Sequence, residues 1–190
     1  MRLLYDNPIT LMWLAFLLYW RIMARGARTT QRMEPAGSRI LRMILFLGAI
    51  VLFLWHSIPV RWLHVRVLPL GYACYNIGIV LTAAGIALAV WARVHLGANW
   101  SRSVTVKQDH ELITTGPYRL VRHPIYTGIL LGILGSAVAP GQVRGLIAIA
   151  LISWALWRKL RLEESWMREQ FGDSYANYSR HTAALVPGLL

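Results

Sequence analysis

Long apolar blocks alternate with polar, arginine-rich segments along the chain. The blocks run over Ile9–Met23, Met43–Ile58, Val67–Trp91, Ile125–Ala139 and Val143–Trp157. Helices of soluble proteins usually carry an apolar stripe on one face, whereas predominantly apolar blocks of this length are typical of helices that cross a membrane. The pattern therefore predicts an all-α, multi-pass integral membrane protein with about five transmembrane helices.

The third block is predicted to lie at the centre of the bundle, and the fourth to form the first arm of a hairpin. Val67–Trp91 has 25 residues, enough to cross with tilt. Small residues in it allow close helix packing; they are Gly71, Ala73, Gly78, Ala83, Ala84, Gly85 and Ala87. Ile125–Ala139 has only 15 residues, about 22 Å of helix, which is short for a core of roughly 30 Å. Because Pro140 and Gly141 make a turn, we expect a tight helical hairpin with Val143–Trp157.

The last apolar block is predicted to continue out of the membrane as one helix. Charged residues follow it without a helix breaker, and Gly172 is a plausible stop. Lys159 and Glu163 are four residues apart and share one face. Alone, they would make an ordinary surface ion pair worth a few tenths of a kcal/mol. If the hairpin closes, Glu163 emerges near His123 and Tyr126, with a polar pocket between them at the bilayer surface.

The basic residues are distributed unevenly between the polar segments. Of the 20 lysines and arginines, sixteen lie in residues 21–42, 93–122 and 158–190, and four lie elsewhere. This alternation follows the positive-inside rule and places the amino terminus outside and the carboxyl terminus in the cytoplasm. Attraction to anionic membrane lipids explains the net charge of +12, so no nucleic-acid partner is expected.

Cysteine and metal chemistry are not indicated. Cys74 is the only cysteine, so no intrachain disulfide can form, and its apolar surroundings favour a core residue. The six histidines are scattered along the chain, and their spacing predicts no metal site.

The segment from His95 to His123 is rich in charged and hydrogen-bonding groups and ends where an apolar block starts. Tyr118, Arg122 and His123 lie close together there. Such groups are costly at a membrane boundary unless a function retains them. The structural alternative is a cytoplasmic loop that lies on the bilayer, with Trp100 as an interfacial anchor.

Six short motifs follow one another in the second half of the chain. They are Asn99-Trp100-Ser101, His110-Glu111-Leu112-Ile113, Gly116-Pro117-Tyr118, Arg122-His123-Pro124-Ile125-Tyr126, Glu163-Glu164 and Phe171-Gly172-Asp173-Ser174-Tyr175. In this order they resemble the isoprenylcysteine carboxyl methyltransferase family, whose wider relatives are the phospholipid N-methyltransferases. The resemblance begins at about residue 90. We expect an amino-terminal transmembrane helix pair over residues 1–66 and a methyltransferase core over residues 67–190.

The resemblance implies S-adenosyl-L-methionine as the methyl donor, held by the carboxyl-terminal half in a cytoplasmic pocket. It fits the absence of a G-x-G-x-x-G motif after a strand, which marks a Rossmann site. A carboxylate can pair with the donor's ammonium, a histidine can donate to its carboxylate, and a tyrosine face can attract its sulfonium. The residues implied to line the cofactor cavity are His110, Glu111, Leu112, Ile113, Tyr118, His123, Pro124 and Tyr126, with Glu163 at the cofactor's amino-acid end.

One position departs from the family pattern. Where the family places a substrate-binding arginine four residues before the glutamate, this chain has Lys159, with Arg158 and Arg161 beside it. Lysine offers a point charge and lacks the bidentate fork of arginine. On a regular helix Arg161 points about 160° away from Glu163. Either Lys159 binds the substrate, or local geometry brings Arg161 round.

Three functions are compatible with these residues. Methyl ester formation on a lipophilic carboxylate, such as a prenylcysteine, is favoured because a carboxylate is ionised at pH 7 and needs no base. N-methylation of a phospholipid amine requires a base, for which His95, His110, His123 and Glu164 are the candidates. A membrane scaffold without catalysis is the third. A nicotinamide-dependent sterol reductase is disfavoured, because Ile125 and Ile129 stand where asparagine and aspartate are typical.

Overall fold

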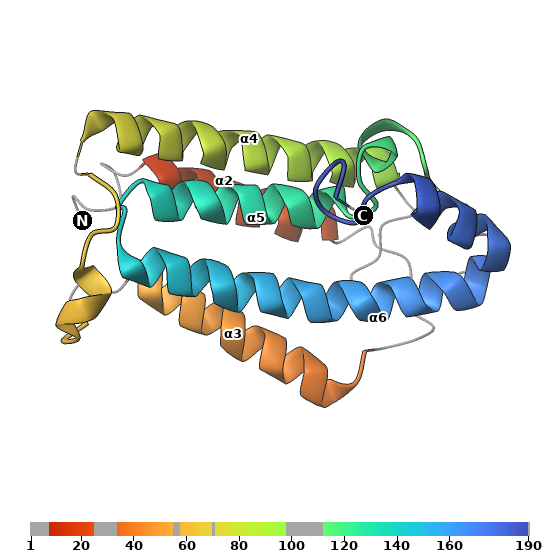
Figure 1. The fold of residues 1–190 in the computed structure, drawn as a ribbon, viewed down its shortest axis with the longest axis horizontal. Coiled ribbons are helices and arrows are strands. Elements are labelled where there is room, and N and C mark those ends of the chain that lie inside the picture. The colour runs from red at the N-terminus through yellow and green to blue at the C-terminus, as the bar shows by residue number, and fades with distance from the viewer. Residues whose placement is uncertain (1–7, 25–33, 55–57, 70, 98–111, 190) are drawn as a thin grey trace.

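The computed structural model describes residues 8–24, 34–54, 58–69, 71–97 and 112–189 (Figure 1). Within these ranges the chain forms five α-helices and two short 3₁₀ helices, and β-pairing is limited to isolated bridges. In chain order the helices are α2 (Pro8–Met23), α3 (Ala36–Leu54), η2 (Arg61–His64), α4 (Tyr72–Leu96), η4 (Gly116–Arg119), α5 (Pro124–Val138) and α6 (Val143–His181). The predicted all-α fold is confirmed for the described part of the chain.

Two of these helices, α3 with 19 residues and α4 with 25, are long and apolar enough to cross a membrane. The helices α2 and α5 are apolar but shorter. Helix α3 begins at Ala36 and not at Met43, because the intervening arginines are good helix formers. Helix α4 begins at Tyr72 and not at Val67, because the Val67 N–H donates to Gly141 O at 2.8 Å and stays outside the helix.

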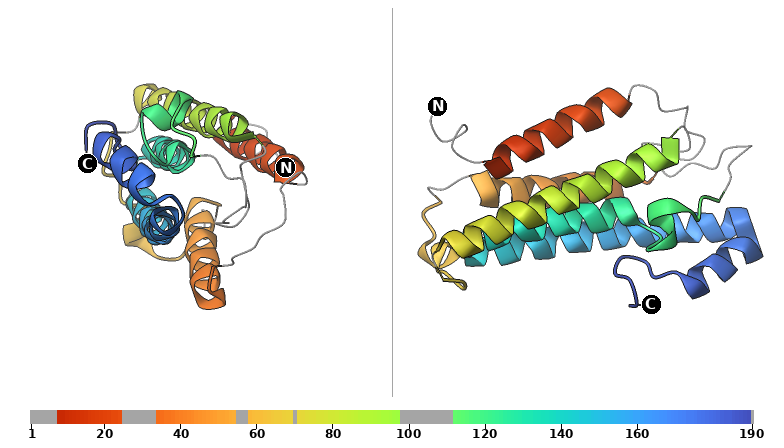
Figure 2. Two further views of the ribbon diagram at one scale, coloured as in Figure 1. Left: turned by 90° about the vertical axis from the view of Figure 1, so that its right-hand side faces the viewer. Right: turned by 90° about the horizontal axis from the view of Figure 1, so that it is seen from above.

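Helices α4 and α5 lie side by side (Figure 2), and their backbones approach closely at glycines. A Cβ added at Gly85 would lie 2.3 Å from Gly132 N and 2.4 Å from Gly128 O. The buried Thr82 hydroxyl donates across the interface to Gly132 O at 3.2 Å. In lipid, where apolar burial does not drive helix association, such close approach supplies the packing energy.

The close packing of α4 is as expected, but α4 lies on one side of the bundle and not at its centre (Figure 1), and most of its small residues do not make the contact with α5. Of the small residues predicted there, Gly78 and Gly85 are buried, whereas Ala83, Ala84 and Ala87 are exposed. A contact face recurs about every 3.6 residues, so only the small residues on that period can meet α5.

The predicted hairpin of α5 and α6 is confirmed. Gly141 turns the chain with a φ of 59°, and a Cβ at Gly145 would lie 2.8 Å from the Ala137 Cβ, so the arms are close at the turn. Helix α6 then runs far beyond α5 and is interrupted at Gly172, whose φ is 49°. After this break the chain folds back, and its end lies beside the amino-terminal end of α5 (Figure 1).

Helix α3 lies at the edge of the bundle against α6 (Figure 2). Among its residues only Ala49 is buried. Surface of this kind is suited to lipid, because contiguous exposed apolar patches are uncommon on soluble monomers. Its exposed large apolar side chains are Ile40, Met43, Ile44, Leu47, Ile50, Val51 and Leu54.

Candidate active site

The amino-terminal end of α5 is fixed by a proline and by the carboxyl-terminal tail. Pro124 is the first residue of α5, where its missing N–H costs nothing and its fixed φ suits a helix start. The backbone N–H groups of Arg122 and His123 donate to Ala183 O at 2.8 Å and Ala184 O at 3.0 Å. The tail therefore holds His123 at the mouth of the hairpin.

Four side chains meet at this end, two from α6, one from the first turn of α5 and one from the residue before α5. The Tyr126 hydroxyl donates to Glu163 Oε1 at 2.6 Å. Lys159 Nζ lies 3.4 Å from the same oxygen and 5.3 Å from the centroid of the Tyr126 ring. The rings of His123 and Tyr126 stack, with centroids 5.4 Å apart and planes 2° from parallel. We call Tyr126, Lys159, Glu163 and His123 the hairpin cluster; it confirms that Glu163 emerges beside His123 and Tyr126.

One atom of this cluster has unused hydrogen-bonding capacity. His123 Nε2 is buried and has no hydrogen-bond partner among the described residues. Its nearest carboxylate oxygen, Glu164 Oε1, is 3.5 Å away, which is long for a hydrogen bond. His123 Nδ1 is 3.6 Å from Glu163 Oε2. Since buried polar atoms are usually satisfied, this nitrogen is suited to contact a bound molecule.

The second glutamate of the pair is engaged in a separate ion pair. Glu164 Oε1 accepts from Nε and Nη2 of Arg122 at 2.9 and 2.7 Å. Burial opposes ionisation of Glu164, but His123 and Arg122 outweigh it and lower its pKa to about 2. Arg122 Nη1 also donates to the carbonyl oxygens of Ser179, at 3.0 Å, and Thr182. This pair therefore ties α6 to the tail, and Glu164 is a poor proton acceptor.

Tyr118 lies beside the end of α4, and its hydroxyl bonds there and not to the hairpin cluster. Its hydroxyl donates to Ala92 O at 3.4 Å, and its own carbonyl accepts from the Tyr178 hydroxyl at 2.5 Å. Burial raises its pKa far above the usual range. The ring stacks on His95 at 6.3 Å, and a side chain at Gly116 would clash with that imidazole at 2.6 Å.

The other residues predicted for the site are placed as follows. Leu112 and Ile113 are half-buried just before η4. His110 and Glu111 lie outside the described residues. Arg161 is exposed, and its guanidinium carbon lies 5.9 Å from the centroid of the Trp157 ring. The structure thus brings Lys159 to the cluster and leaves Arg161 on another face of α6.

Sequence reasoning missed the role of the carboxyl-terminal tail. Besides the bonds to Arg122 and His123, Leu185 O accepts from the Thr127 hydroxyl at 2.7 Å. Tyr175, which is almost fully buried, packs edge-on against Tyr178 at 6.1 Å. The sequence did contain a signal for this packing, namely Tyr175 and Tyr178 in a charged segment. A tyrosine can bury its ring and still form a hydrogen bond through its hydroxyl.

Comparison with known proteins places these features in a family. The family model described as phospholipid methyltransferase matches residues 73–174. Protein-S-isoprenylcysteine O-methyltransferase B of Arabidopsis thaliana is 27% identical over 115 residues, covering 59% of this chain and 58% of that protein. The cobalt-zinc-cadmium resistance protein CzcN of Cupriavidus metallidurans is 30% identical over 149 residues, covering 77% of this chain and 61% of that protein. The chain thus spans about three fifths of the length of these relatives.

A solved structure has the same fold. It is that of a eukaryotic intramembrane Ras methyltransferase, isoprenylcysteine carboxyl methyltransferase, with a TM-score of 0.56 at 23% identity over 77% of this chain and 52% of that one. The family match covers more than half of the chain and includes the whole hairpin cluster. The chain therefore belongs to the phospholipid methyltransferase family and is similar to the protein-S-isoprenylcysteine O-methyltransferases.

Proposed function

We propose that this protein is an S-adenosylmethionine-dependent membrane methyltransferase that forms a methyl ester on the carboxylate of a lipophilic, prenylcysteine-like acceptor. The hairpin cluster carries the proposal, because it sets an anion, a cation and two stacked rings at one end of the bundle. Relatives named as protein-S-isoprenylcysteine O-methyltransferases support the same chemistry.

The cluster suits the methyl donor. Glu163 would pair with the ammonium group of S-adenosylmethionine, and His123 Nε2 would donate to its carboxylate. The Tyr126 ring would attract the sulfonium by about 0.5–2 kcal/mol. When bound, this donor supplies an electrophilic methyl group. The chain's own residues would orient it and exclude water, since placing nucleophile and methyl carbon in line supplies most of the rate gain.

The acceptor is proposed to be a carboxylate because, with His123 assigned to the donor's carboxylate, the other candidate bases among the described residues are already engaged. Glu164 is held ionised by Arg122, with a pKa of about 2, and His95 Nε2 is engaged with the Thr115 hydroxyl at 3.0 Å. A lipid amine must lose a proton before it can attack, whereas a carboxylate attacks as it is. Phospholipid N-methylation is the second candidate, and the name of the matched family favours it.

We infer a multi-pass arrangement with the cluster and the carboxyl terminus on the cytoplasmic side. The basic residues on that side of the apolar blocks support it. Residues 67–190 would then form the catalytic core, with the helices before them as its membrane partner. In a Cys74→Ala background, a cysteine at the exposed Asp173 should react with a membrane-impermeant reagent from the cytoplasmic face only. Labelling from the other face would overturn the orientation.

Donor binding is tested by calorimetry on the purified protein in detergent. Glu163→Gln should weaken S-adenosylmethionine binding at least tenfold, because it removes the charge that pairs with the ammonium. The matched control is Asp173→Asn, which removes an exposed carboxylate after the Gly172 break. Equal affinity in both variants would remove Glu163 from the donor site, and no binding by the unaltered protein would favour a non-catalytic scaffold.

The acceptor is identified by transfer of labelled methyl groups in a membrane lipid extract supplemented with an S-prenylated N-acetylcysteine. Label released by mild base is an ester and supports the proposal. Label that survives base and migrates with a zwitterionic lipid would establish N-methylation in its place.

A further inference from the structure

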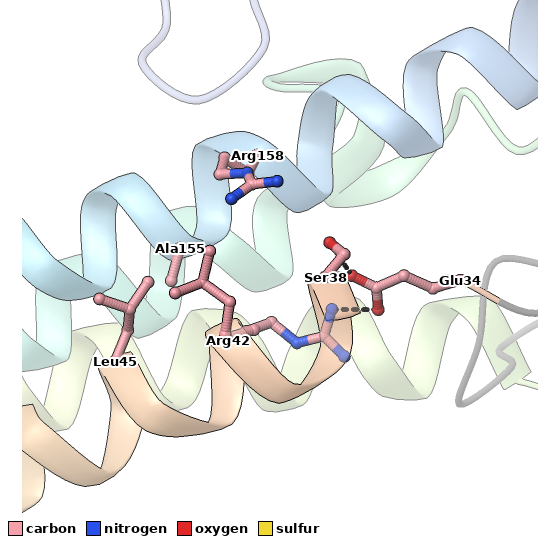
Figure 3. A pocket seen from close by; sticks show the side chains of 7 residues that line it. Glu34, Ser38, Arg42, Leu45, Ala155 and Arg158 are labelled. Carbon is pink, nitrogen blue, oxygen red and sulfur yellow. Dashed lines mark hydrogen bonds and ion pairs between the residues drawn. The ribbon is translucent and has the colours of Figure 1, made fainter. Parts of the chain in front are cut away.

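A pocket lies between the amino-terminal half of α3, which precedes the family match, and the middle of α6, which lies within it (Figure 3). It is small and partly open to solvent, far below the roughly 300–1,000 Å³ typical of sites for whole drug-sized ligands. A ligand could therefore place only its anionic end here, and only by displacing the Glu34 carboxylate. Its polar wall is made by Glu34, Ser38, Arg42 and Arg158, and its apolar wall includes Leu45 and Ala155.

The polar wall already holds a carboxylate. Glu34 accepts from the Arg42 guanidinium and from the Ser38 hydroxyl, the latter at 2.8 Å. The Glu34 side chain is only 9% exposed and that of Arg42 is 22% exposed. Burial raises the pKa of Glu34, but the bonds from Arg42 and Ser38 and the charge of Lys159 outweigh it and leave the pKa below its usual value. These groups thus bind an ionised carboxylate in a partly dehydrated site.

The pocket has an excess of positive charge. Among its lining residues, Arg42 and Arg158 stand against the carboxylate of Glu34, whereas Lys159, next in the chain, is paired with Glu163. Glu34 neutralises only one of the two arginines. An anion that enters the pocket is therefore electrostatically favoured.

The pocket adjoins the hairpin cluster. Lys159 follows Arg158 directly on α6 and contacts both Glu163 and the Tyr126 ring. Next to its polar wall, Leu45 belongs to a helix with a second, exposed apolar face that includes Met43, Ile44 and Leu47. An amphiphile could therefore place its anionic end near the cluster and its apolar chain along α3.

We propose that Arg42 binds the carboxylate of the amphiphilic methyl acceptor, taking the place that Glu34 occupies at its guanidinium, while the apolar chain lies against α3. This inference rests on the proposed function and deepens it. Arg42 would supply, from a different helix, the bidentate fork that Lys159 cannot offer.

The reaction balances without a proton acceptor. An oxygen of the acceptor carboxylate forms a bond to the methyl carbon as the carbon–sulfur bond breaks, and the bonding pair stays on sulfur. The products are a neutral ester and a neutral thioether. Because the ester has no charge, it loses its attraction to Arg42, and Glu34 can return to the guanidinium, which assists product release.

The test compares Arg42→Gln, Glu34→Gln and the control Arg39→Gln, which removes an exposed charge from the same helix. With an S-prenylated N-acetylcysteine as acceptor, Arg42→Gln should raise KM at least tenfold and leave the Kd of S-adenosylmethionine unchanged. Glu34→Gln should lower KM, because it removes the competing carboxylate. Arg39→Gln should match the unaltered protein.

A purely structural ion pair would give a different result. Both Arg42→Gln and Glu34→Gln would then lower kcat or weaken donor binding, and neither would improve KM; this outcome overturns the inference. If the unaltered protein transfers no methyl group to a carboxylate, the proposed function fails. The role of Arg42 is then tested separately, by measuring calorimetrically how the prenylated acid and its neutral amide bind. If the unaltered protein binds the acid more tightly than the amide, and Arg42→Gln removes this difference, the proposed site is supported. If the unaltered protein binds acid and amide equally, the inference is overturned.

Discussion

Replacing Glu164 with glutamine should destabilise the protein by about 3 kcal/mol at neutral pH. The carboxylate and the Arg122 guanidinium are only 8% and 11% exposed, and two hydrogen bonds of 2.9 and 2.7 Å join them. Burial opposes the charge, yet His123 and Arg122 lower the Glu164 pKa from 4.5 to about 2. Since one pKa unit is about 1.4 kcal/mol, this lowering corresponds to about 3 kcal/mol. Breaking a buried pair typically costs about 3–5 kcal/mol, which agrees.

The same pair predicts how stability depends on pH. Because the pKa of Glu164 is lower in the folded than in the unfolded state, its stabilisation is fully present above pH 4.5 and is lost as the pH falls towards 2. The unaltered protein should therefore lose stability across this window. The Glu164→Gln variant should show a flatter profile, because it has no carboxylate to protonate there.

The assay is unfolding in mixed micelles with a denaturing detergent, followed by tryptophan fluorescence. Glu164→Gln, Arg122→Gln and the double variant form a mutant cycle, in which the double variant should cost clearly less than the two single changes together. Arg168→Gln is the control, because that side chain is 59% exposed and 3.6 Å from Glu164 Oε2, so it should change stability by less than about 1 kcal/mol. Additive single effects, or a Glu164→Gln variant as stable as the control, would refute the reasoning.

Three further changes test the packing, the donor contact and the tail. Gly85→Ala should lower the thermal midpoint markedly, because its Cβ would lie 2.3 Å from the α5 backbone, whereas Gly37→Ala has open space; equal midpoints would contradict the glycine contact. Tyr126→Leu should weaken S-adenosylmethionine binding about 2- to 30-fold through the lost cation–π attraction, while Tyr126→Phe keeps the ring and should retain much of that affinity. Deleting the residues after His181 should abolish methyl transfer, because it removes the carbonyl oxygens that hold Arg122, His123 and Thr127; a fully active truncated protein would show that the tail is dispensable.

The choice between Lys159 and Arg161 illustrates what local spacing can predict. Residues four apart on a helix share a face and residues two apart do not, so spacing alone favours Lys159 beside Glu163. The structure has this arrangement, with Lys159 at 3.4 Å from Glu163 Oε1 and Arg161 over Trp157. Which of the two binds the acceptor remains a prediction, and the pocket at Arg42 adds a third cation that spacing along α6 could not reveal.

The sequence by itself determined the helices, the hairpin and the face of α6 that carries Glu163. These features depend on apolar runs, on Pro124 at a helix start, and on Gly141 and Gly172 at breaks, all of which act on neighbouring residues. Only the tertiary structure decided which distant groups meet. The Arg122–Glu164 pair spans 42 positions and the Thr127–Leu185 bond spans 58. The α3–α6 pocket likewise joins Glu34 and Arg158. No periodicity encodes such contacts, because they depend on how the helices pack and on where the chain turns back.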